Sequence, residues 1–254
     1  MMVARSIGEL ALPTRGVIGL VPTMGALHAG HAALFEAARS ECDVLVASVF
    51  VNPAQFGDGA DLDAYPRDLD TDARIAEEHG VDVLFAPAAS EMYPAGFATW
   101  VVPEGVAEGL EGAHRPGHFR GVATVCLKLF NIVRPHRAWF GRKDAQQVAV
   151  LKQMVRDLNL DLEIRVVDTV RDADGLALSS RNARLSTDQR AQALAIPRAL
   201  AMRDAAGARD VLADAGITPD YVEVADLDGL TLAVAAQIGG TRLIDNVLLE
   251  GDTE

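Results

Sequence analysis

Residues 22–31 read Pro22-Thr23-Met24-Gly25-Ala26-Leu27-His28-Ala29-Gly30-His31. The apolar run at 17–21 before them predicts a buried strand, and the spacing of apolar residues over 31–40 predicts a helix. The two histidines therefore fall where a strand passes into the N-terminus of a helix. Unpaired backbone N–H groups and the positive end of the helix dipole favour an anion there, and phosphate is the usual one. Glycines at 25 and 30 allow the backbone to come close to such a ligand.

Two other interpretations of the histidine pair stay open: ordinary histidines, or two ligands of a metal site. A zinc site needs a third ligand, preferably from cysteines at short spacing. The cysteines of this chain, Cys42 and Cys126, are isolated from each other. The pattern therefore favours nucleotide binding over a metal site at the histidine pair, and we assign no residue as a metal ligand from it.

Length, composition and charge narrow the classes of function. With 254 residues, half of them hydrophobic, the chain can bury a sizeable core. Arg5 and Glu9 interrupt the region where a signal peptide needs an apolar core, and no apolar run is long enough to cross a bilayer. Two unpaired cysteines agree with a reducing compartment, so we expect a soluble cytoplasmic protein. A net charge of −13 argues against nucleic acid as a partner but leaves room for a small anion in a local positive pocket.

Apolar runs alternate with helical patterns over the first two thirds of the chain. The predicted strands are 17–21, 44–51, 81–85, 137–140 and 162–167, and the predicted helices are 31–40, 70–79, 121–133 and 144–158. Gly80 and Asn159 suit left-handed helix caps. Such alternation predicts an α/β fold with a parallel sheet, whose ligand lies beyond the carboxyl ends of the strands.

The pattern changes after about residue 169. An Ala-rich helical segment over 187–215 precedes short strand-like runs at 221–225, 230–235 and 242–249. Ser186 and Gln189 form a capping box for the helical segment, and Pro197 is expected to interrupt it. We therefore predict a larger domain over 1–169 and a smaller α+β domain over 170–254.

Three further segments carry polar groups suited to a nucleotide and its acceptor. In Val51-Asn52-Pro53-Ala54-Gln55-Phe56-Gly57 the Gln55 amide can both donate and accept. In Phe140-Gly141-Arg142-Lys143-Asp144-Ala145-Gln146-Gln147 the lysine offers a charge for phosphate. In Leu178-Ser179-Ser180-Arg181-Asn182 two hydroxyls precede a guanidinium that can bind two phosphate oxygens. A structural turn and a solvated Lys-Asp pair are the alternatives for the first two segments.

The loop at 114–121, His114-Arg115-Pro116-Gly117-His118-Phe119-Arg120-Gly121, gathers cations in an acidic chain. It is either an anion-facing loop or a solvated turn.

Taken in order, these motifs and Tyr65-Pro66-Arg67 resemble the pantothenate synthetase (pantoate–β-alanine ligase) family from about residue 17 to 250. His-x-Gly-His alone is shared by a whole nucleotidyltransferase superfamily, whereas six motifs in order are specific. The resemblance implies a Rossmann-like N-terminal domain, a C-terminal domain that closes over the active site, and a homodimer. It also implies a two-step reaction: pantoate and ATP with Mg²⁺ give pantoyl adenylate and pyrophosphate, and β-alanine then displaces AMP to form pantothenate, a precursor of coenzyme A.

The resemblance also implies the site residues. Those matching ATP contacts are Met24, Gly25, Ala26, Leu27, His28, Ala29, Gly30, His31, Gly141, Arg142, Lys143, Asp144, Val170, Leu178, Ser179, Ser180 and Arg181. Gln55 and Gln147 match positions that hold pantoate, with Gln55 also close to β-alanine. His31 matches the proton donor, and we expect His28, His31, Lys143 and Arg181 to stabilise the charge on the departing pyrophosphate.

The chain departs from the family pattern at three places. Arg142 stands where the family usually has Glu, and Ala145 replaces a common aromatic residue. The acidic stretch 68–72 only partly matches carboxylates linked to metal in relatives, which leaves Asp72 as a candidate.

Other functions remain as alternatives. A different adenylyl or cytidylyl transferase, or a nucleotide-sensing module without turnover, would share the histidine motif. A tRNA synthetase is disfavoured by the acidic balance and by the lack of room for a substantial tRNA-binding domain.

Overall fold

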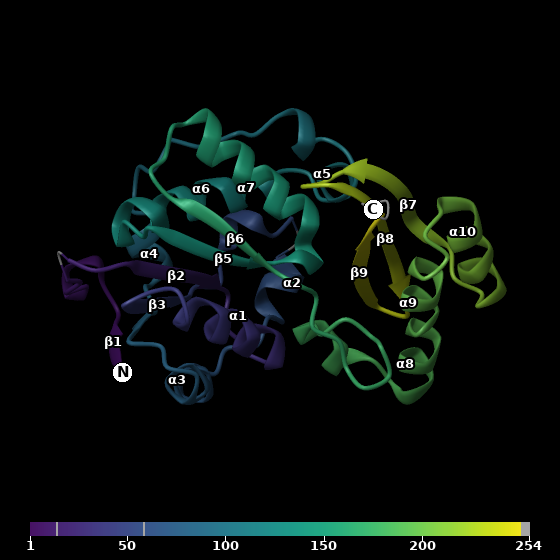
Figure 1. Ribbon diagram of the computed structural model, residues 1–254, viewed down its shortest axis with the longest axis horizontal. Coiled ribbons are helices and arrows are strands. Elements are labelled where there is room, and N and C mark those ends of the chain that lie inside the picture. Colours follow the sequence, from purple (N-terminus) through teal and green to yellow (C-terminus); the bar gives the residue numbers. More distant parts are fainter. Residues whose placement is uncertain (14, 58, 250–254) are drawn as a thin grey trace. The chain divides into compact units, whose positions relative to one another are not determined.

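The structure is a computed structural model, and it describes residues 1–13, 15–57 and 59–249 (Figure 1). The chain forms two compact units. The N-terminal unit comprises Met1–Phe140 and Val150–Val167, and the C-terminal unit comprises Gly141–Ala149 and Asp168–Glu254. The segment 141–149, with the predicted lysine motif, thus packs with the C-terminal unit.

A six-stranded sheet in the order β1-β4-β3-β2-β5-β6 forms the centre of the N-terminal unit. Its strands are β1 (Met2–Ala4), β2 (Ile18–Thr23), β3 (Val44–Val49), β4 (Val83–Phe85), β5 (Arg137–Gly141) and β6 (Glu163–Val167). The pairs β1–β4, β4–β3, β3–β2 and β2–β5 are parallel. The predicted α/β fold with a parallel sheet is confirmed, whereas β1, only three residues long, was not predicted.

Helices link the parallel strands. They are α1 (Ala29–Arg39), α2 (Gly59–Asp63), α3 (Leu69–Glu78), α4 (Ala89–Met92), α5 (Glu111–His114), α6 (His118–Val133) and α7 (Ala145–Asp157). Short 3₁₀ turns lie at Ile7–Glu9, Pro53–Gln55, Gly105–Ala107, Arg142–Asp144 and Ser180–Arg184. In Figure 1, α1 and α3 lie on one side of the sheet and α6 on the other, as right-handed crossovers require when the strand order runs outward from β2 in both directions.

The strand order reverses between β2 and β5, the position where open parallel sheets bind ligands. β2 is buried along most of its length, and a core of Phe35, Leu45, Leu84 and Trp139 packs around the sheet. Gly80 (φ +76°) and Asn159 (φ +51°) adopt the left-handed conformation that was predicted for them at helix ends. The turn that follows β2 therefore starts from a buried strand at this position of the sheet.

The C-terminal unit packs three helices against an antiparallel sheet in the order β7-β8-β9. Its elements are α8 (Thr187–Ala193), α9 (Ala195–Leu200), α10 (Ala205–Asp214), β7 (Pro219–Asp226), β8 (Leu230–Ile238) and β9 (Thr241–Leu248). The α+β class is confirmed. No helix among the described residues combines the length and apolarity needed to cross a membrane.

The Ala-rich segment is three helices, and the interruption expected from Pro197 is found just before this residue. The first break falls at Leu194, and Pro197 lies in the first turn of α9, where its missing N–H leaves no helical hydrogen bond unmade. The second break follows Leu200, and α10 is capped by Asp204, which accepts from Gly207 N at 2.7 Å. The predicted capping box is confirmed: Gln189 N donates to Ser186 Oγ at 3.2 Å, and Ser186 N to Gln189 Oε1 at 2.9 Å.

Both cysteines are free thiols buried in the N-terminal unit. Burial raises the pKa of Cys126 to about 12, so its reactive thiolate form is strongly disfavoured at pH 8. Burial also raises the pKa of Cys42, whose Sγ donates to Ala38 O at 3.1 Å. We expect neither thiol of the folded protein to react with a chromogenic disulfide reagent at pH 8, and both to react in denaturant. Rapid reaction of the native protein would contradict this burial.

Candidate active site

The turn after β2 is shaped by a chain of side-chain contacts. Thr23 Oγ1 donates to Ser48 O at 2.6 Å and accepts from Gly25 N at 3.2 Å. Gly25 (φ +82°) and Ala26 (φ +52°) then take the left-handed conformation, which redirects the chain from β2 into α1. The predicted strand-to-helix junction is confirmed at this place.

The two histidines close the N-terminus of α1 as a capping box. His28 is the N-cap, and its Nδ1 accepts from Gly30 N at 3.1 Å, while His28 N donates to His31 Nδ1 at 3.2 Å. The ring centroids lie 4.2 Å apart. A ring nitrogen that accepts an N–H carries no proton, so in the neutral rings both protons lie on Nε2. Both imidazoles therefore offer an Nε2–H donor at the positive end of a helix.

Asp72 of α3 stabilises the same turn through hydrogen bonds to its main chain. It is 2% exposed, and its carboxylate accepts from Ala26 N at 3.1 Å and from Leu27 N at 2.8 Å. Burial raises the pKa of this carboxyl, and the two backbone hydrogen bonds lower it in part. These two contacts give Asp72 a structural role at the turn. Among the described residues, no group of three His, Cys, Asp or Glu side chains is arranged to hold a metal ion.

The Gln55 amide is held from two sides at the end of a 3₁₀ turn. Asn52 Nδ2 donates to Gln55 Oε1 at 3.0 Å, and Gln55 Nε2 donates to Met24 Sδ at 3.0 Å. Asn52 is itself fixed, because its Oδ1 accepts from Tyr93 Oη at 2.8 Å and from Ala54 N at 3.2 Å. Burial raises the pKa of Tyr93 to about 12, which keeps its hydroxyl a donor. This network brings the predicted residues Gln55 and Met24 into contact.

His118 at the start of α6 fixes the main chain of Gln55. Its Nδ1 lies 3.0 Å from Gln55 O, and its Nε2 lies 3.2 Å from a guanidinium nitrogen of Arg115. Arg115 in turn lies 3.7 Å from the Glu111 carboxylate. The cation-rich loop at 114–121 therefore contributes internal contacts, which neither of the two sequence interpretations included. Arg120, in the first turn of α6, lies with its guanidinium carbon 4.3 Å from the centroid of the Trp100 ring.

Gly121 allows α6 to lie directly against the turn that carries Gln55. A Cβ at this position would lie 2.3 Å from Ala54 O and 2.6 Å from Gln55 N. Asn52 Nδ2 also donates to Gly121 O at 3.1 Å, which ties the two segments together. Any side chain larger than hydrogen must push the turn away from the helix.

We expect Gly121→Ala to destabilise the protein by about 1–3 kcal/mol, the usual cost of overpacking, and to raise the KM for the acceptor that Gln55 is predicted to bind. Denaturant unfolding and steady-state kinetics measure the two effects. Gly57→Ala is the matched control, since a Cβ there meets nothing within 4 Å. Unchanged stability of the Gly121 variant would contradict the close packing.

A second group of predicted residues lies in the C-terminal unit. Asn246 of β9 donates from Nδ2 to Arg142 O and to Lys143 O, both at 2.9 Å, and so fixes the turn that carries the lysine. The Arg142 guanidinium lies 3.6 Å from the Asp168 carboxylate and 3.8 Å from that of Asp228. The arginine that replaces the family's usual Glu is therefore matched by two acids of this chain.

The serine-arginine motif forms the last 3₁₀ turn in the same unit. Ser179 caps it by accepting from Arg181 N at 3.2 Å, and Leu178 N donates to Val170 O at 2.9 Å. Nearby, the Arg171 guanidinium binds the Asp245 carboxylate through two hydrogen bonds of 2.6 and 3.1 Å. The segments at 168–172 and 176–181 are thus held as one loop.

The predicted site residues therefore form two groups. The N-terminal unit brings together Met24 to His31 and Gln55; the C-terminal unit contains Gly141 to Asp144, Gln147, Val170 and Leu178 to Arg181. Tyr93 and Asn246 were missed, since their partners are distant in sequence and no local motif marks them. Asn52 and His118 lie within the quoted segments 51–57 and 114–121, but the sequence did not assign them these contacts.

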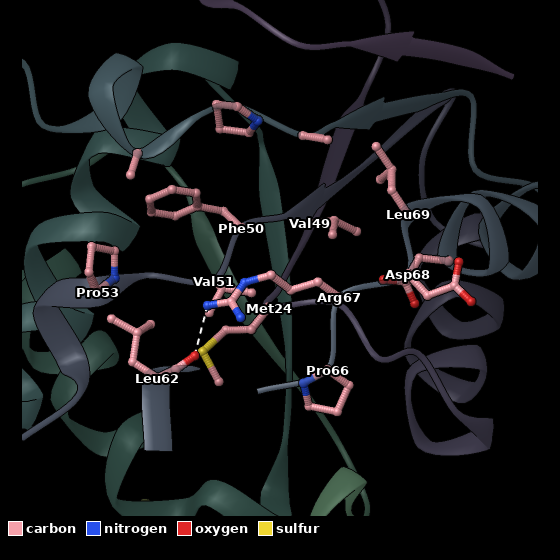
Figure 2. A pocket seen from close by; sticks show the side chains of 14 residues that line it. Met24, Val49, Phe50, Val51, Pro53, Leu62, Pro66, Arg67, Asp68 and Leu69 are labelled. Atoms are coloured by element: carbon pink, nitrogen blue, oxygen red, sulfur yellow. Dashed lines mark hydrogen bonds between the residues drawn. The ribbon is translucent and has the colours of Figure 1, made fainter. Parts of the chain in front are cut away.

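A cavity of about 370 Å³ lies beyond β3 and β4 in the N-terminal unit. Figure 2 shows Met24, Phe50 and Arg67 among its lining side chains. The Arg67 guanidinium donates to Leu62 O at 2.7 Å and to Tyr65 O at 3.1 Å, the first drawn as a dashed line. Most of the other lining side chains are apolar, and Asp68 and Asp72 add two carboxylates.

The chain is similar to pantothenate synthetases over almost its whole length. The family model described as pantoate-beta-alanine ligase matches residues 4–248. A pantothenate synthetase of Moorella thermoacetica is 53% identical over 92% of this chain and 91% of its own length. One from Corynebacterium glutamicum (strain R) is 54% identical over 91% of this chain and 93% of its own.

Solved structures agree with these relatives. The pantothenate synthetase of Thermus thermophilus superposes with a TM-score of 0.93 at 47% identity and covers 99% of this chain and 100% of its own. The Francisella tularensis pantoate-beta-alanine ligase, whose crystal was complexed with beta-gamma ATP and β-alanine, has a TM-score of 0.90 at 38% identity over 100% of both chains. The resemblance seen in the sequence is confirmed, and the chain belongs to the pantoate–β-alanine ligase family.

Proposed function

We propose that this chain is an AMP-forming ligase that joins (R)-pantoate to β-alanine through a pantoyl adenylate and so makes pantothenate for coenzyme A biosynthesis. The observation that carries the proposal is the match to family members over almost the whole of both chains, one of them solved with an ATP compound and β-alanine. The capping-box histidines supply the chemistry expected of such a site, two N–H donors at a helix N-terminus.

In the first step a pantoate carboxylate oxygen bonds to the α-phosphorus, and the bond from that phosphorus to the bridging oxygen breaks. Pyrophosphate leaves with the electron pair of that bond. His28, His31, Lys143 and Arg181 donate to the charge that gathers on it, because fixed donors aimed at developing charge supply most of the rate gain in such transfers. No enzyme nucleophile is needed, since the carboxylate attacks directly.

In the second step the β-alanine amine attacks the acyl carbon, loses a proton and displaces AMP. Gln55 and Gln147 hold pantoate in place for both steps, and Gln55 is also close to the amine. The amide of Gln55 suits this work because its partners Asn52 and Met24 already fix its orientation. The site also withholds water from the acyl adenylate.

Mg²⁺ enters as the ion of MgATP. It prefers phosphate oxygens and water, with at most one or two protein carboxylates. The remaining elements of the proposal follow the family resemblance: the two domains 1–169 and 170–254, with the smaller closing over the nucleotide; ATP contacts at Met24 to His31, Gly141 to Asp144, Val170 and Leu178 to Arg181; a homodimer; and a cytoplasmic location without nucleic-acid or membrane partners.

Incubation of the purified protein with ATP, Mg²⁺, D-pantoate and β-alanine tests the proposal. We expect release of AMP, pyrophosphate and pantothenate. Formation of ADP, or no AMP at any substrate concentration, would refute it. Without β-alanine, pyrophosphate exchange into ATP is expected with pantoate; exchange that requires another acid would identify a different transferase, and ATP binding without exchange a sensing module.

A further inference from the structure

The turn between β2 and α1 has a conformation that its sequence does not favour. Ala26 has φ +52°, in the left-handed region, which costs a residue with a Cβ about 1–2 kcal/mol. Gly25 before it has φ +82°. Such a conformation persists only where surrounding contacts determine it.

Asp72 supplies those contacts. Its Oδ2 accepts from Ala26 N at 3.1 Å and its Oδ1 from Leu27 N at 2.8 Å, so one carboxylate holds two consecutive peptide groups. The approach is close, because a Cβ on Gly25 would lie 2.6 Å from Asp72 Oδ2 and 3.0 Å from Val49 Cγ1. The Asp72 carboxylate therefore occupies the space that a side chain at position 25 would need.

Burying the Asp72 carboxylate costs free energy. Asp72 is 2% exposed, and in the described part of the chain it forms no ion pair with a Lys, Arg or His. Burying a charge without a counter-ion costs several kcal/mol unless hydrogen bonds offset it. The two turn N–H groups provide that offset, and an apolar residue in α3 would avoid the cost altogether.

We propose that Asp72 is a positioning residue of the ligase, which holds the peptide groups of Ala26 and Leu27 so that His28 and His31 meet the triphosphate correctly. The inference rests on the proposed function. His28 follows Leu27 directly and is the N-cap of α1, so a shift of the turn moves both the cap and the ring that it orients. Asp72 touches neither nucleotide nor acceptor in this role.

The test compares Asp72→Asn with the wild type in pantoate-dependent pyrophosphate exchange and in thermal unfolding. Asparagine keeps the shape and one acceptor but turns an NH₂ group toward the second N–H. We expect the exchange kcat to fall about tenfold or more, as misplaced catalytic groups do, while the KM for β-alanine in the full reaction changes less than twofold. The matched control is Asp68→Ala on the same helix. Asp68 caps α3 through Thr71 N at 3.1 Å, so its loss lowers stability by about 1 kcal/mol and leaves kcat unchanged.

A second arm measures whether Asp72 acts through the strained residue. Glycine at position 26 adopts the left-handed conformation freely. The fold decrease in exchange kcat caused by Asp72→Asn should therefore be about fivefold smaller in an Ala26→Gly background than in the wild type. Three results would overturn the inference. These are an exchange kcat of Asp72→Asn within twofold of the wild type, an equal loss of kcat in Asp68→Ala, or the same fold decrease in kcat from Asp72→Asn in the wild type and in Ala26→Gly. If the wild type itself shows no exchange with pantoate, the proposed function fails, which is a separate outcome.

Discussion

Replacing His31 with alanine is expected to lower the rate of AMP formation by about 10²-fold or more, the usual effect of losing one donor to a charged transition state. The variant removes an Nε2–H donor from the N-terminus of α1. It also removes the Nδ1 that accepts from His28 N at 3.2 Å, so the remaining histidine is less well oriented. Steady-state AMP release, with circular dichroism to verify the fold, measures the effect.

His79→Ala is the control for this prediction. His79 follows α3 in the same unit, and its ring lies 3.2 Å from the Glu36 carboxylate. The substitution therefore removes an imidazole that lies outside the proposed site. We expect this control to retain the wild-type rate. A near-normal rate in His31→Ala would remove that histidine from the mechanism.

Lys143→Ala is the second change with a large expected effect. The ammonium group is a mobile point charge suited to the phosphate tail, and its turn is fixed by Asn246. We expect kcat/KM for ATP to fall by about 10²-fold, because in the proposed mechanism the lost charge stabilises the departing pyrophosphate. Initial rates at varied ATP give the ratio.

Lys152→Ala, on the following helix α7, tests whether any lost lysine has this effect. It should keep kcat/KM for ATP within about twofold of the wild type, as surface substitutions usually do. An unchanged kcat/KM in Lys143→Ala itself would show that the lysine faces solvent, the alternative that the sequence left open.

Local patterns predicted most of the fold because they depend on neighbours along the chain. The apolar run at 17–21 became β2, and the histidine pair fell at the start of α1 as expected. The three-residue β1 carries too little pattern to be recognised. Within 187–215, alanine content alone does not mark helix ends. Asp204 as N-cap and Arg203 with φ +56° identify the second break only once the geometry is known.

The candidate site was predictable where motifs are contiguous and not where contacts cross the chain. Asp72 lies 45 residues from Leu27, and Asn246 lies 103 residues from Lys143. A sequence shows an aspartate in an acidic stretch, which suggests metal as readily as a backbone contact. Only folding reveals that both oxygens of Asp72 meet N–H groups.

One of the departures from the family pattern also depends on contacts between residues that are distant in sequence. Arg142 in place of Glu is accounted for by the nearby acids Asp168 and Asp228, neither of which adjoins it in sequence. Ala145, in place of an aromatic residue, is buried at the start of α7. Nothing in the structure explains why a smaller side chain stands there.

If the pantoate carboxylate attacks the α-phosphorus of ATP, one of its oxygens must leave with AMP. Pantoate labelled with ¹⁸O in its carboxylate tests this directly, when the products are analysed by mass spectrometry after one turnover with β-alanine. We expect one ¹⁸O atom in the phosphate of AMP and none in pyrophosphate, because the carboxylate oxygen that bonded to phosphorus leaves with AMP. Label in inorganic phosphate beside ADP, or AMP without label, would contradict it.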